Sequence, residues 1–257
     1  MIIVTGASGT LGAPLTRGLA AADGARVRAL SRRSRTGEDG VTWHRADLKT
    51  GEGLGAALAG AETIVHCASD WRHPKDDLAA ARNLVDAAWK QGAPHLVYIS
   101  IVGVDKIPYP YYRVKHQVER LIEDSGLPYT ILRTTQFHTL PAMVLDALTK
   151  VPGIMPLPTG LRVQPIDVGE VAGRMAELAL APGPARRVDD MGGPEVLTLE
   201  EIARSYLRAR GRRGVRLPFP LFGKTARGFK EGHHLAPGHK AGKRTWQEYL
   251  DERRTGG

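Results

Sequence analysis

The chain has 257 residues, of which 42% are hydrophobic and 25% charged, a composition that is ordinary for a soluble globular protein with a full core. No apolar run approaches the roughly 20 residues that cross a bilayer, which excludes a membrane-spanning helix. The opening MIIVTG is expected to be a buried strand and not a signal peptide. The single cysteine, Cys67, excludes an internal disulfide and fits a reducing cytoplasm.

The net charge of +9 is concentrated near the C-terminus. Between Arg204 and Arg244, twelve Lys and Arg residues stand against one acid, Glu231, so this segment carries +11 and the remainder is close to −2. A basic lobe of this kind suits an anionic small-molecule substrate, a nucleic acid or an acidic partner. A simple solvated surface explains it equally well.

In the first half of the chain, short β-branched segments alternate with helical patterns. Strands are expected over residues 1–6, 27–33, 41–47, 63–69, 95–103 and 129–137, and helices over residues 11–22, 76–91 and 111–125. Strands that alternate with helices and are apolar on both faces predict a parallel sheet covered on each side. Right-handed crossovers make this α/β fold a doubly wound, or Rossmann, sheet.

The pattern changes after about residue 140, where several prolines interrupt the alternation. A helix is expected over residues 167–180 with Asp167 as its N-cap, a second begins at the capping box formed by Thr198 and Glu201, and a third covers residues 245–254. Residues 211–242 are expected to be largely irregular. We therefore predict a nucleotide-binding domain over residues 1–150 and a smaller substrate lobe over residues 151–257, with residues 163–191 returning to the sheet.

The segment TGASGTLG over residues 5–12 is the strongest functional signal. It follows a strand and opens a helix, which is the context that a glycine-rich dinucleotide motif requires. The glycines permit a tight turn, a close approach of backbone to a pyrophosphate and close helix–sheet packing, and the helix N-terminus offers free N–H groups to the phosphates. The cofactor contacts expected here come from Gly6, Ser8, Gly9, Thr10 and Leu11.

The end of the second strand favours NADP(H) over NAD(H). A carboxylate there would bind the ribose diol of NAD, but this strand ends in Ser31, Arg32 and Arg33. Two guanidinium groups suit a 2′-phosphate, although they would also be ordinary in a solvated loop. After the third strand, Asp47 and Leu48 are expected to bracket the adenine.

Several segments together resemble the atypical, NmrA-like branch of the short-chain dehydrogenase/reductase superfamily. These are TGASGTLG, RADL, YISIVG, PYYRVK with Glu119 downstream, SGLPYTILRTTQF, IDVGEVA and TWQEYL, which cover nearly the whole chain. The resemblance implies the fold and a bound nicotinamide cofactor. It implies the activity less specifically, because the branch includes reductases, quinone reductases and cofactor-binding regulators without turnover.

The resemblance also implies a catalytic set of Ser100, Tyr111 and Lys115. A spacing of four residues places Tyr111 and Lys115 on one helix face, whereas Tyr112 lies about 100° round the helix. In reductases of the superfamily the tyrosine protonates the substrate oxygen, the lysine holds the nicotinamide ribose and the serine binds the substrate oxygen. The serine usually lies further from the tyrosine than it does here. The alternative is that both tyrosines pack structurally and Lys115 serves cofactor binding alone.

Other residues at strand ends are expected to line the cofactor. Backbone at Cys67, Ala68 and Ser69 should pass the cofactor, with Cys67 a small hydrophobe and not a nucleophile. Thr134 and Phe137 follow a strand at the carboxyl edge of the sheet and could line the nicotinamide pocket. We expect no metal site, because the histidines near residue 234 have no Cys or carboxylate cluster around them.

The leading hypothesis is an NADPH-dependent oxidoreductase that reduces a carbonyl, enone or quinone group of a small molecule. The alternative is a non-catalytic NADP(H)-binding redox sensor that acts through a protein partner. A nucleic-acid binder ranks third, since no DNA- or RNA-binding module is recognisable. The pattern is compatible with a monomer or a homodimer, indicates no membrane partner and favours a cytoplasmic location.

Overall fold

The computed structural model describes residues 1–37, 40–149, 154–212 and 215–255, which form two compact units. The first unit contains residues 1–100, 110–133 and 168–189. The second contains the described residues within 101–109, 134–167 and 190–257. The domain boundary expected between residues 150 and 151 lies outside the described residues. Both units are therefore built from segments that are separated in the sequence.

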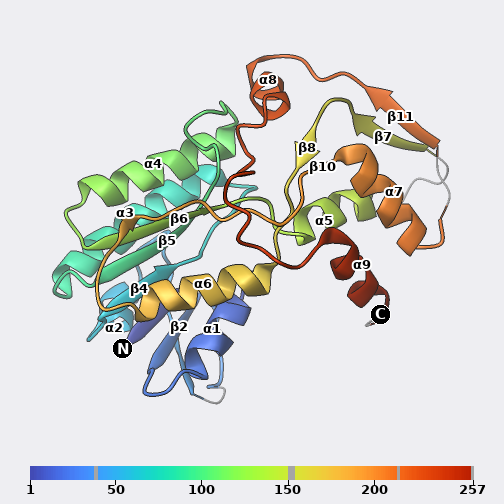
Figure 1. Ribbon diagram of the computed structural model, residues 1–257. Helices are drawn as coiled ribbons and strands as arrows, with labels where there is room; N and C mark the ends of the chain where they lie inside the picture. The colour runs from blue at the N-terminus through green and yellow to red at the C-terminus, as the bar shows by residue number, and fades with distance from the viewer. Residues whose placement is uncertain (38–39, 150–153, 213–214, 256–257) are drawn as a thin grey trace. The chain divides into compact units, whose positions relative to one another are not determined.

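A seven-stranded sheet in the order β3-β2-β1-β4-β5-β6-β9 is the centre of the first unit (Figure 1). The ladders that join β2 to β3, β1 to β2 and β4, β4 to β5, and β6 to β9 are all parallel. The strands are β1 (Ile2–Thr5), β2 (Val27–Ser31), β3 (Val41–Arg45), β4 (Thr63–His66), β5 (His95–Ile101), β6 (Tyr129–Thr134) and β9 (Arg186–Arg187). The central strands β1 and β4 are buried along their whole length, as apolar strands covered on both faces must be.

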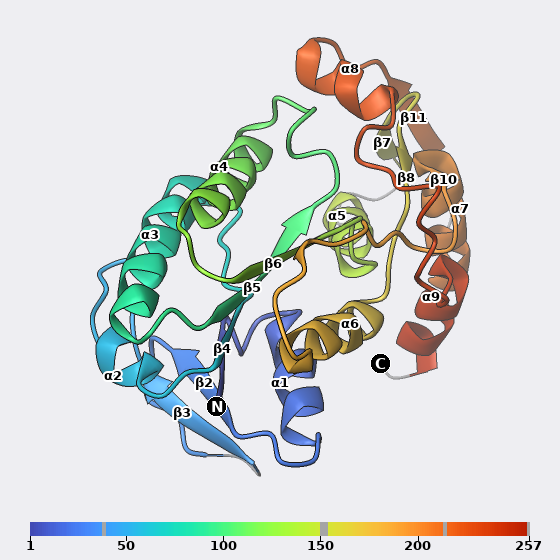
Figure 2. The ribbon, with the colours of Figure 1, turned by 60° about the vertical axis from the view of Figure 1, so that its left-hand side comes forward.

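Helices cover both faces of this sheet (Figure 2). One layer contains α2 (Leu54–Leu58), α3 (Pro74–Lys90) and α4 (Pro110–Asp124), with α3 packed against both neighbours. The other layer contains α1 (Gly12–Ala20) packed against α6 (Val168–Leu180). The main core fills the first of these interfaces and includes Ile64, Leu84, Leu96 and Ile122, which are at most 1% exposed. The predicted doubly wound α/β fold is confirmed.

The second unit has its own small core. Its helices are α5 (Thr139–Leu148), α7 (Leu199–Ala209), α8 (Lys224–Lys230) and α9 (Trp246–Thr255), and its strands are β7 (Ile154–Pro158), β8 (Arg162–Val163), β10 (Leu197–Thr198) and β11 (Val215–Phe219). Strand β11 runs parallel to β7, and β10 runs antiparallel to β8. Buried Leu145, Tyr206 and Trp246 bring α5, α7 and α9 together in one cluster.

The predicted capping box at the start of α7 is confirmed. The Thr198 hydroxyl accepts the backbone N–H of Glu201 at 3.2 Å, while the Glu201 carboxylate accepts the backbone N–H of Thr198 at 2.8 Å. The prediction that residues 211–242 are largely irregular is wrong for β11 and α8. Strand β11 depends on pairing with the distant β7, and α8 has only seven residues, so neither has a strong local pattern. Within the described residues, no helix is long and apolar enough to cross a membrane.

Candidate functional site

The glycine-rich segment forms a tight turn between β1 and α1. Gly6 has a φ of +66°, and a Cβ there would stand 2.6 Å from the backbone nitrogen of Ala68. The N–H of Gly9 donates to the carbonyl of Gly6 at 2.8 Å, which closes the turn. A Cβ at Gly12 would overlap the same carbonyl oxygen. Only glycine therefore fits at Gly6 and Gly12, and the backbone lies as close as a pyrophosphate cradle requires.

The surface of this turn is open to a ligand. Ser8, Gly9 and Thr10 are exposed, whereas Leu11 is buried beneath them. Helix α1 begins directly afterwards at Gly12, and its first turn contains no acidic side chain that would repel a phosphate. The residues present thus fit the phosphates of a dinucleotide, which would meet exposed backbone N–H groups and the positive end of α1.

Thr5 links the glycine-rich turn to the end of β4 through hydrogen bonds. Its hydroxyl is hydrogen-bonded to Nδ1 of His66 at 2.8 Å and accepts the backbone N–H of Ala68 at 3.3 Å. Burial, aided by the nearby positive charge of Lys115, lowers the pKa of His66 to about 3. His66 is therefore neutral at physiological pH, and it joins the ends of β1 and β4 where the cofactor backbone contacts at Cys67 and Ala68 are expected.

The loop after β2 presents a cluster of guanidinium groups. Arg32 and Arg33 are exposed, and in the described part of the chain neither forms an ion pair. The N–H of Arg33 donates to the Ser31 hydroxyl at 3.1 Å, which shapes the turn. A third cation, Arg35, lies with its guanidinium 4.9 Å from the ring centroid of Trp43 on β3. The sequence prediction omitted Arg35, although the run SRRSR contains it.

The loop after β3 is held by α3. Asp47 accepts the backbone N–H of Lys49 at 2.8 Å, and the Asn83 side-chain amide donates to the carbonyls of Leu48 and Lys49, both at 2.9 Å. Asn83 thus fixes the loop that is expected to bracket the adenine, and the sequence prediction did not identify it. The residue lies mid-helix, where an asparagine has no local signature of a loop contact.

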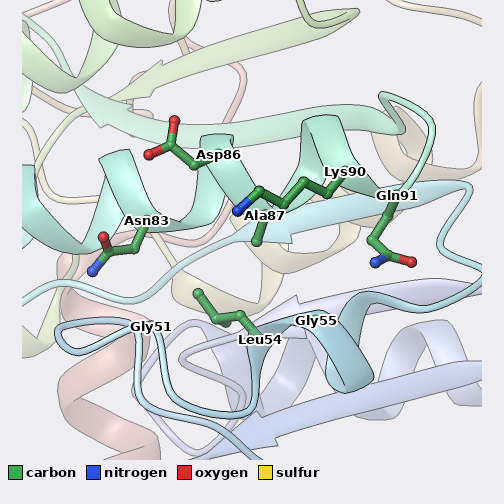
Figure 3. Close-up of a pocket in the computed structure, with 8 residues that line it drawn as sticks. All are labelled: Gly51, Leu54, Gly55, Asn83, Asp86, Ala87, Lys90 and Gln91. Carbon is green, nitrogen blue, oxygen red and sulfur yellow. The ribbon is translucent and has the colours of Figure 1, made fainter.

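A surface groove of about 270 Å³ lies beside this loop, between α2 and α3 (Figure 3). It is lined by Gly51, Leu54, Gly55, Asn83, Asp86, Ala87, Lys90 and Gln91. None of the predicted cofactor or catalytic residues lines it. The groove is therefore separate from the glycine-rich cradle.

Lys115 is a buried lysine of the first unit with a strongly shifted pKa. Its side chain is 3% exposed, its ammonium donates to the carbonyl of Ile99 at 2.8 Å, and it lies 4.4 Å from the ring centroid of Tyr98. Burial lowers the pKa of Lys115 to about 8, although the charge of Asp77 acts in the opposite direction. A lysine kept in such a position at a cost in desolvation is typical of a functional site.

The Tyr111 hydroxyl belongs to a hydrogen-bonded chain. It lies 2.8 Å from Oγ of Ser69, and that hydroxyl donates to Oδ2 of Asp77 at 2.5 Å. The other carboxylate oxygen of Asp77 accepts the backbone N–H of Asp70 at 2.8 Å. Tyr112, by contrast, is 6% exposed and packs in the core. The structure therefore brings Tyr111 together with Ser69, which was predicted only as a cofactor contact.

Asp77 is a functional candidate that the sequence prediction missed. It stands beside Asp76 in the first turn of α3, where acidic residues are common because they stabilise the helix N-terminus. Only the fold shows that Asp77 is 9% exposed and faces Ser69, while the Asp76 carboxylate pairs with Lys49 on the surface.

Ser100 is the last residue of the first segment of the first unit and lies near the end of β5. It is 1% exposed, and its hydroxyl has no hydrogen-bond partner among the described residues. It follows Ile99, whose carbonyl binds Lys115. A buried hydroxyl without a partner is costly, and a bound substrate or cofactor oxygen would remove that cost. The assignment of Ser100 to substrate binding stays a prediction.

Cys67, Thr134 and Phe137 are the remaining predicted cofactor contacts. Burial raises the pKa of the Cys67 thiol to about 12, so the thiol is protonated and is no nucleophile. Thr134 is buried at the end of β6, and Phe137, which forms a backbone bridge with Ile166, is half-buried; both belong to the second unit, and their role at the cofactor stays a prediction. Of the histidines near the C-terminus, His234 is hydrogen-bonded to the carbonyl of Arg162.

A family model for NAD(P)H-binding proteins matches residues 6–175, which include the cradle, Tyr111 and Lys115. The chain belongs to this NAD(P)H-binding family. The match confirms the nicotinamide-cofactor-binding family that the resemblance implied.

The relatives that match the chain include a protein named as a reductase and a protein named as an assembly factor. The (4-alkanoyl-5-oxo-2,5-dihydrofuran-3-yl)methyl phosphate reductase of Streptomyces griseus is 28% identical over 220 residues, which are 82% of this chain and 74% of the relative. A photosystem II assembly factor of Cyanophora paradoxa is 33% identical over 148 residues, which are 53% of this chain but only 45% of that factor. The fold matches an NADPH-dependent quinone oxidoreductase of Escherichia coli solved with NADPH, with a TM-score of 0.83, 20% identity, and coverage of 98% of this chain and 99% of the other.

Proposed function

We propose that this protein is an NADPH-dependent oxidoreductase that reduces a carbonyl, enone or quinone group of a small molecule. The observation that carries the proposal is the arrangement on α4: a tyrosine hydroxyl and a buried ammonium lie one helical turn apart, in the unit that contains the glycine-rich cradle. Tyr111 supplies a hydroxyl already engaged in a hydrogen-bonded chain, and Lys115 supplies a positive charge.

The described residues divide the work of cofactor binding. The exposed backbone at Ser8, Gly9 and Thr10 would hold the pyrophosphate at the start of α1. Arg32 and Arg33 would bind the 2′-phosphate of NADPH. The uncharged ribose diol of NADH would not require these two cations. Asp47 and Leu48, in the loop that Asn83 holds, would contact the adenine, and Lys115 the nicotinamide ribose.

The chain's own groups would control the proton. The bound cofactor supplies the hydride. Tyr111, a half-buried residue on the first turn of α4, would donate a proton to the substrate oxygen. The positive charge of Lys115 stabilises negative charge on Tyr111 after the transfer, and Ser100 would bind the same substrate oxygen.

The comparison with the Streptomyces griseus enzyme supports the reductase and suggests a substrate charge. That relative is named as a reductase of a methyl phosphate compound. In the present chain, the basic segment from Arg204 to Arg244 carries the positive charge that would attract an anionic substrate. We therefore extend the proposal to substrates that bear an anionic group.

A second candidate is a cofactor-binding regulator without turnover. It is favoured by the Cyanophora paradoxa relative, which is named as an assembly factor and not as a reductase. In that case the cradle would still bind NADP(H), and the Tyr111 hydroxyl would have no catalytic effect. The two candidates therefore differ in turnover and not in cofactor affinity.

The test is NADPH oxidation by the purified protein against a panel of quinones, enones and aldehydes, with and without an anionic group. Tyr111→Phe and Lys115→Ala are compared with Tyr112→Phe, which removes a hydroxyl from the neighbouring core residue. We expect turnover to fall by about 100-fold or more in Tyr111→Phe and Lys115→Ala, and to persist in Tyr112→Phe.

The outcomes separate the candidates. Turnover that survives in Tyr111→Phe and fails in Lys115→Ala would retain the enzyme and remove the tyrosine from its mechanism. Tight NADPH binding without turnover across the whole panel would contradict the reductase and favour the regulator. Equal affinity for NADPH and NADH would contradict the proposed role of the two arginines.

A further inference from the structure

The side chains of Tyr111, Ser69 and Asp77 form a continuous relay from α4 to the start of α3. Its two hydrogen bonds measure 2.8 Å from Tyr111 to Ser69 and 2.5 Å from Ser69 to Asp77. The Asp77 end is 9% exposed, whereas Ser69 is exposed and Tyr111 half-buried. The relay thus joins the proposed proton donor to a carboxylate that is shielded from solvent.

The number of hydrogens fixes the direction of this relay. The Ser69 hydroxyl has one hydrogen, and it donates that hydrogen to Asp77. A carboxylate can only accept, so Ser69 must accept the hydrogen of Tyr111 whenever Asp77 is ionised. In that state the Tyr111 hydrogen points toward Ser69, and the tyrosine is arranged to take up a proton from a ligand.

A proton on Asp77 reverses both hydrogen bonds. The protonated carboxyl donates to Ser69, and Ser69 then donates to the oxygen of Tyr111. The Tyr111 hydrogen is released from the relay and becomes available to a substrate oxygen. The protonation of one buried carboxylate therefore decides whether the tyrosine donates or accepts a proton.

We propose that Asp77, acting through Ser69, is the positioning residue and proton reservoir of Tyr111. The inference rests on the proposed reductase function and deepens it. As hydride reaches the substrate, the O–H bond of Tyr111 breaks and a substrate O–H bond forms. The Ser69 proton passes to Tyr111, the Asp77 proton passes to Ser69, and Asp77 regains a proton from solvent by way of the exposed Ser69, so that one proton is consumed in each reduction.

Other titratable groups lie around the relay. These are His66 and Cys67 at the end of β4, Tyr98 on β5, and Lys115 and Glu119 on α4. His66 and Cys67 are neutral at physiological pH, burial raises the pKa of Tyr98 well above its usual value, and Glu119 pairs with Arg133. Lys115 is the group whose charge changes near pH 8. Asp77→Asn leaves Lys115 in place, so a pH dependence that this variant removes comes from the relay.

The first measurement is the ultraviolet titration of Tyr111, assigned by subtracting the curve of Tyr111→Phe. Asp77→Asn removes a negative charge, and its amide donates to Ser69, so that the Ser69 hydrogen turns to the Tyr111 oxygen. We expect the midpoint of Tyr111 ionisation to move to lower pH by about one unit or more. Asp86→Asn, an exposed carboxylate further along α3, is the matched control and should leave the midpoint unchanged.

The second measurement is the pH profile of kcat/KM for NADPH-dependent reduction. Because each reduction draws its proton through the relay, kcat/KM of the wild-type protein should fall as the pH rises. Asp77→Asn should remove this fall and lower the acid plateau by about 100-fold, because the reservoir is lost. Ser69→Ala should behave like Asp77→Asn, whereas Ser69→Thr keeps a hydroxyl and should restore the wild-type profile.

The two measurements separate the relay from the reductase. A Tyr111 midpoint and a pH profile that are unchanged in Asp77→Asn would overturn the relay. A shifted midpoint in a protein without turnover would support the relay and contradict the proposed reductase. If Asp77→Asn does not fold, the midpoint of Tyr111 ionisation is measured in Ser69→Ala, which changes an exposed residue. A shift of this midpoint to lower pH supports the relay, and an unchanged midpoint overturns it.

Discussion

Arg133 on β6 and Glu119 on α4 form a buried ion pair with two hydrogen bonds, of 2.8 Å from Nε and 2.5 Å from Nη2. Their side chains are 4% and 2% exposed. Glu119 lies one turn beyond Lys115 on the same helix, so the pair fixes α4 to the sheet next to the proposed catalytic residues. Removing one partner of a buried ion pair strongly lowers the stability of a protein.

The first prediction concerns this pair. Glu119→Leu and Arg133→Met should each lower the free energy of unfolding by about 3–5 kcal/mol, because each removes one partner of a buried ion pair. The double variant should recover much of that loss, since it removes both charges. Urea unfolding of the three variants measures this coupling. Single variants as stable as the wild-type protein would show that the charge left behind finds another partner.

The second prediction concerns the glycine cradle. Gly12→Ala should abolish NADPH binding and destabilise the fold, because its Cβ would overlap the carbonyl oxygen of Gly6. Gly18→Ala in the same helix is the matched control, since a Cβ there meets nothing within 4 Å. The control should bind NADPH normally and gain about 0.5–1 kcal/mol from the helix propensity of alanine. Calorimetric titration with NADPH and thermal unfolding distinguish the two variants.

Much of the first unit could be predicted from local sequence, because its strands are apolar on both faces and its helices have a clear apolar period. The strand expected over residues 95–103 is β5 at His95–Ile101, and the helix expected over residues 111–125 is α4 at Pro110–Asp124. In both cases burial by the sheet and its helical layers strengthens the local preference. The glycine motif was readable for the same reason, since its function depends on local backbone conformation.

The parts that escaped prediction depend on contacts between distant residues. Strand β11 has exposed apolar side chains, with Val215 at 69% and Leu217 at 55%, and it forms only because β7 pairs with it. Asp77 reads in the sequence as one of two acids at a helix start, and its meeting with Ser69 and Tyr111 requires the ends of β4, α3 and α4 to converge. No local pattern carries that information.

The third prediction concerns the choice of cofactor. Arg32→Ala and Arg33→Ala should each raise the Kd for NADPH by about 10-fold or more while leaving the Kd for NADH unchanged, because only NADPH has a 2′-phosphate. Arg26→Ala removes an exposed cation just before β2 and serves as the charge-matched control. The NADPH affinity of the two arginine variants should also lose part of its salt dependence. Equal losses for NADPH and NADH would indicate that the arginines act on the loop and not on the phosphate.

The fourth prediction concerns the desolvation of Lys115. Burial lowers the pKa of Lys115 from 10.5 to about 8, so between these values the unfolded chain binds a proton that the folded chain lacks. The stability penalty is therefore complete below about pH 8 and is relieved as the pH rises toward 10.5. Lys115→Met removes the penalty but leaves the carbonyl of Ile99 without its donor, so the net gain at pH 7 should be about 1–2 kcal/mol.

This gain should be accompanied by a loss of function. Lys115→Met should abolish turnover while it raises the unfolding midpoint, and the difference in stability from the wild-type protein should shrink above pH 8, where the wild-type penalty is relieved. Wild-type turnover should fall as the pH rises through 8, because neutral Lys115 no longer stabilises negative charge on Tyr111. Urea unfolding at pH 7 and pH 9.5, together with the pH dependence of kcat, measures both effects. A Lys115→Met variant less stable than the wild-type protein at pH 7 would mean that the contacts with Ile99 and Tyr98 outweigh the cost of burying the charge.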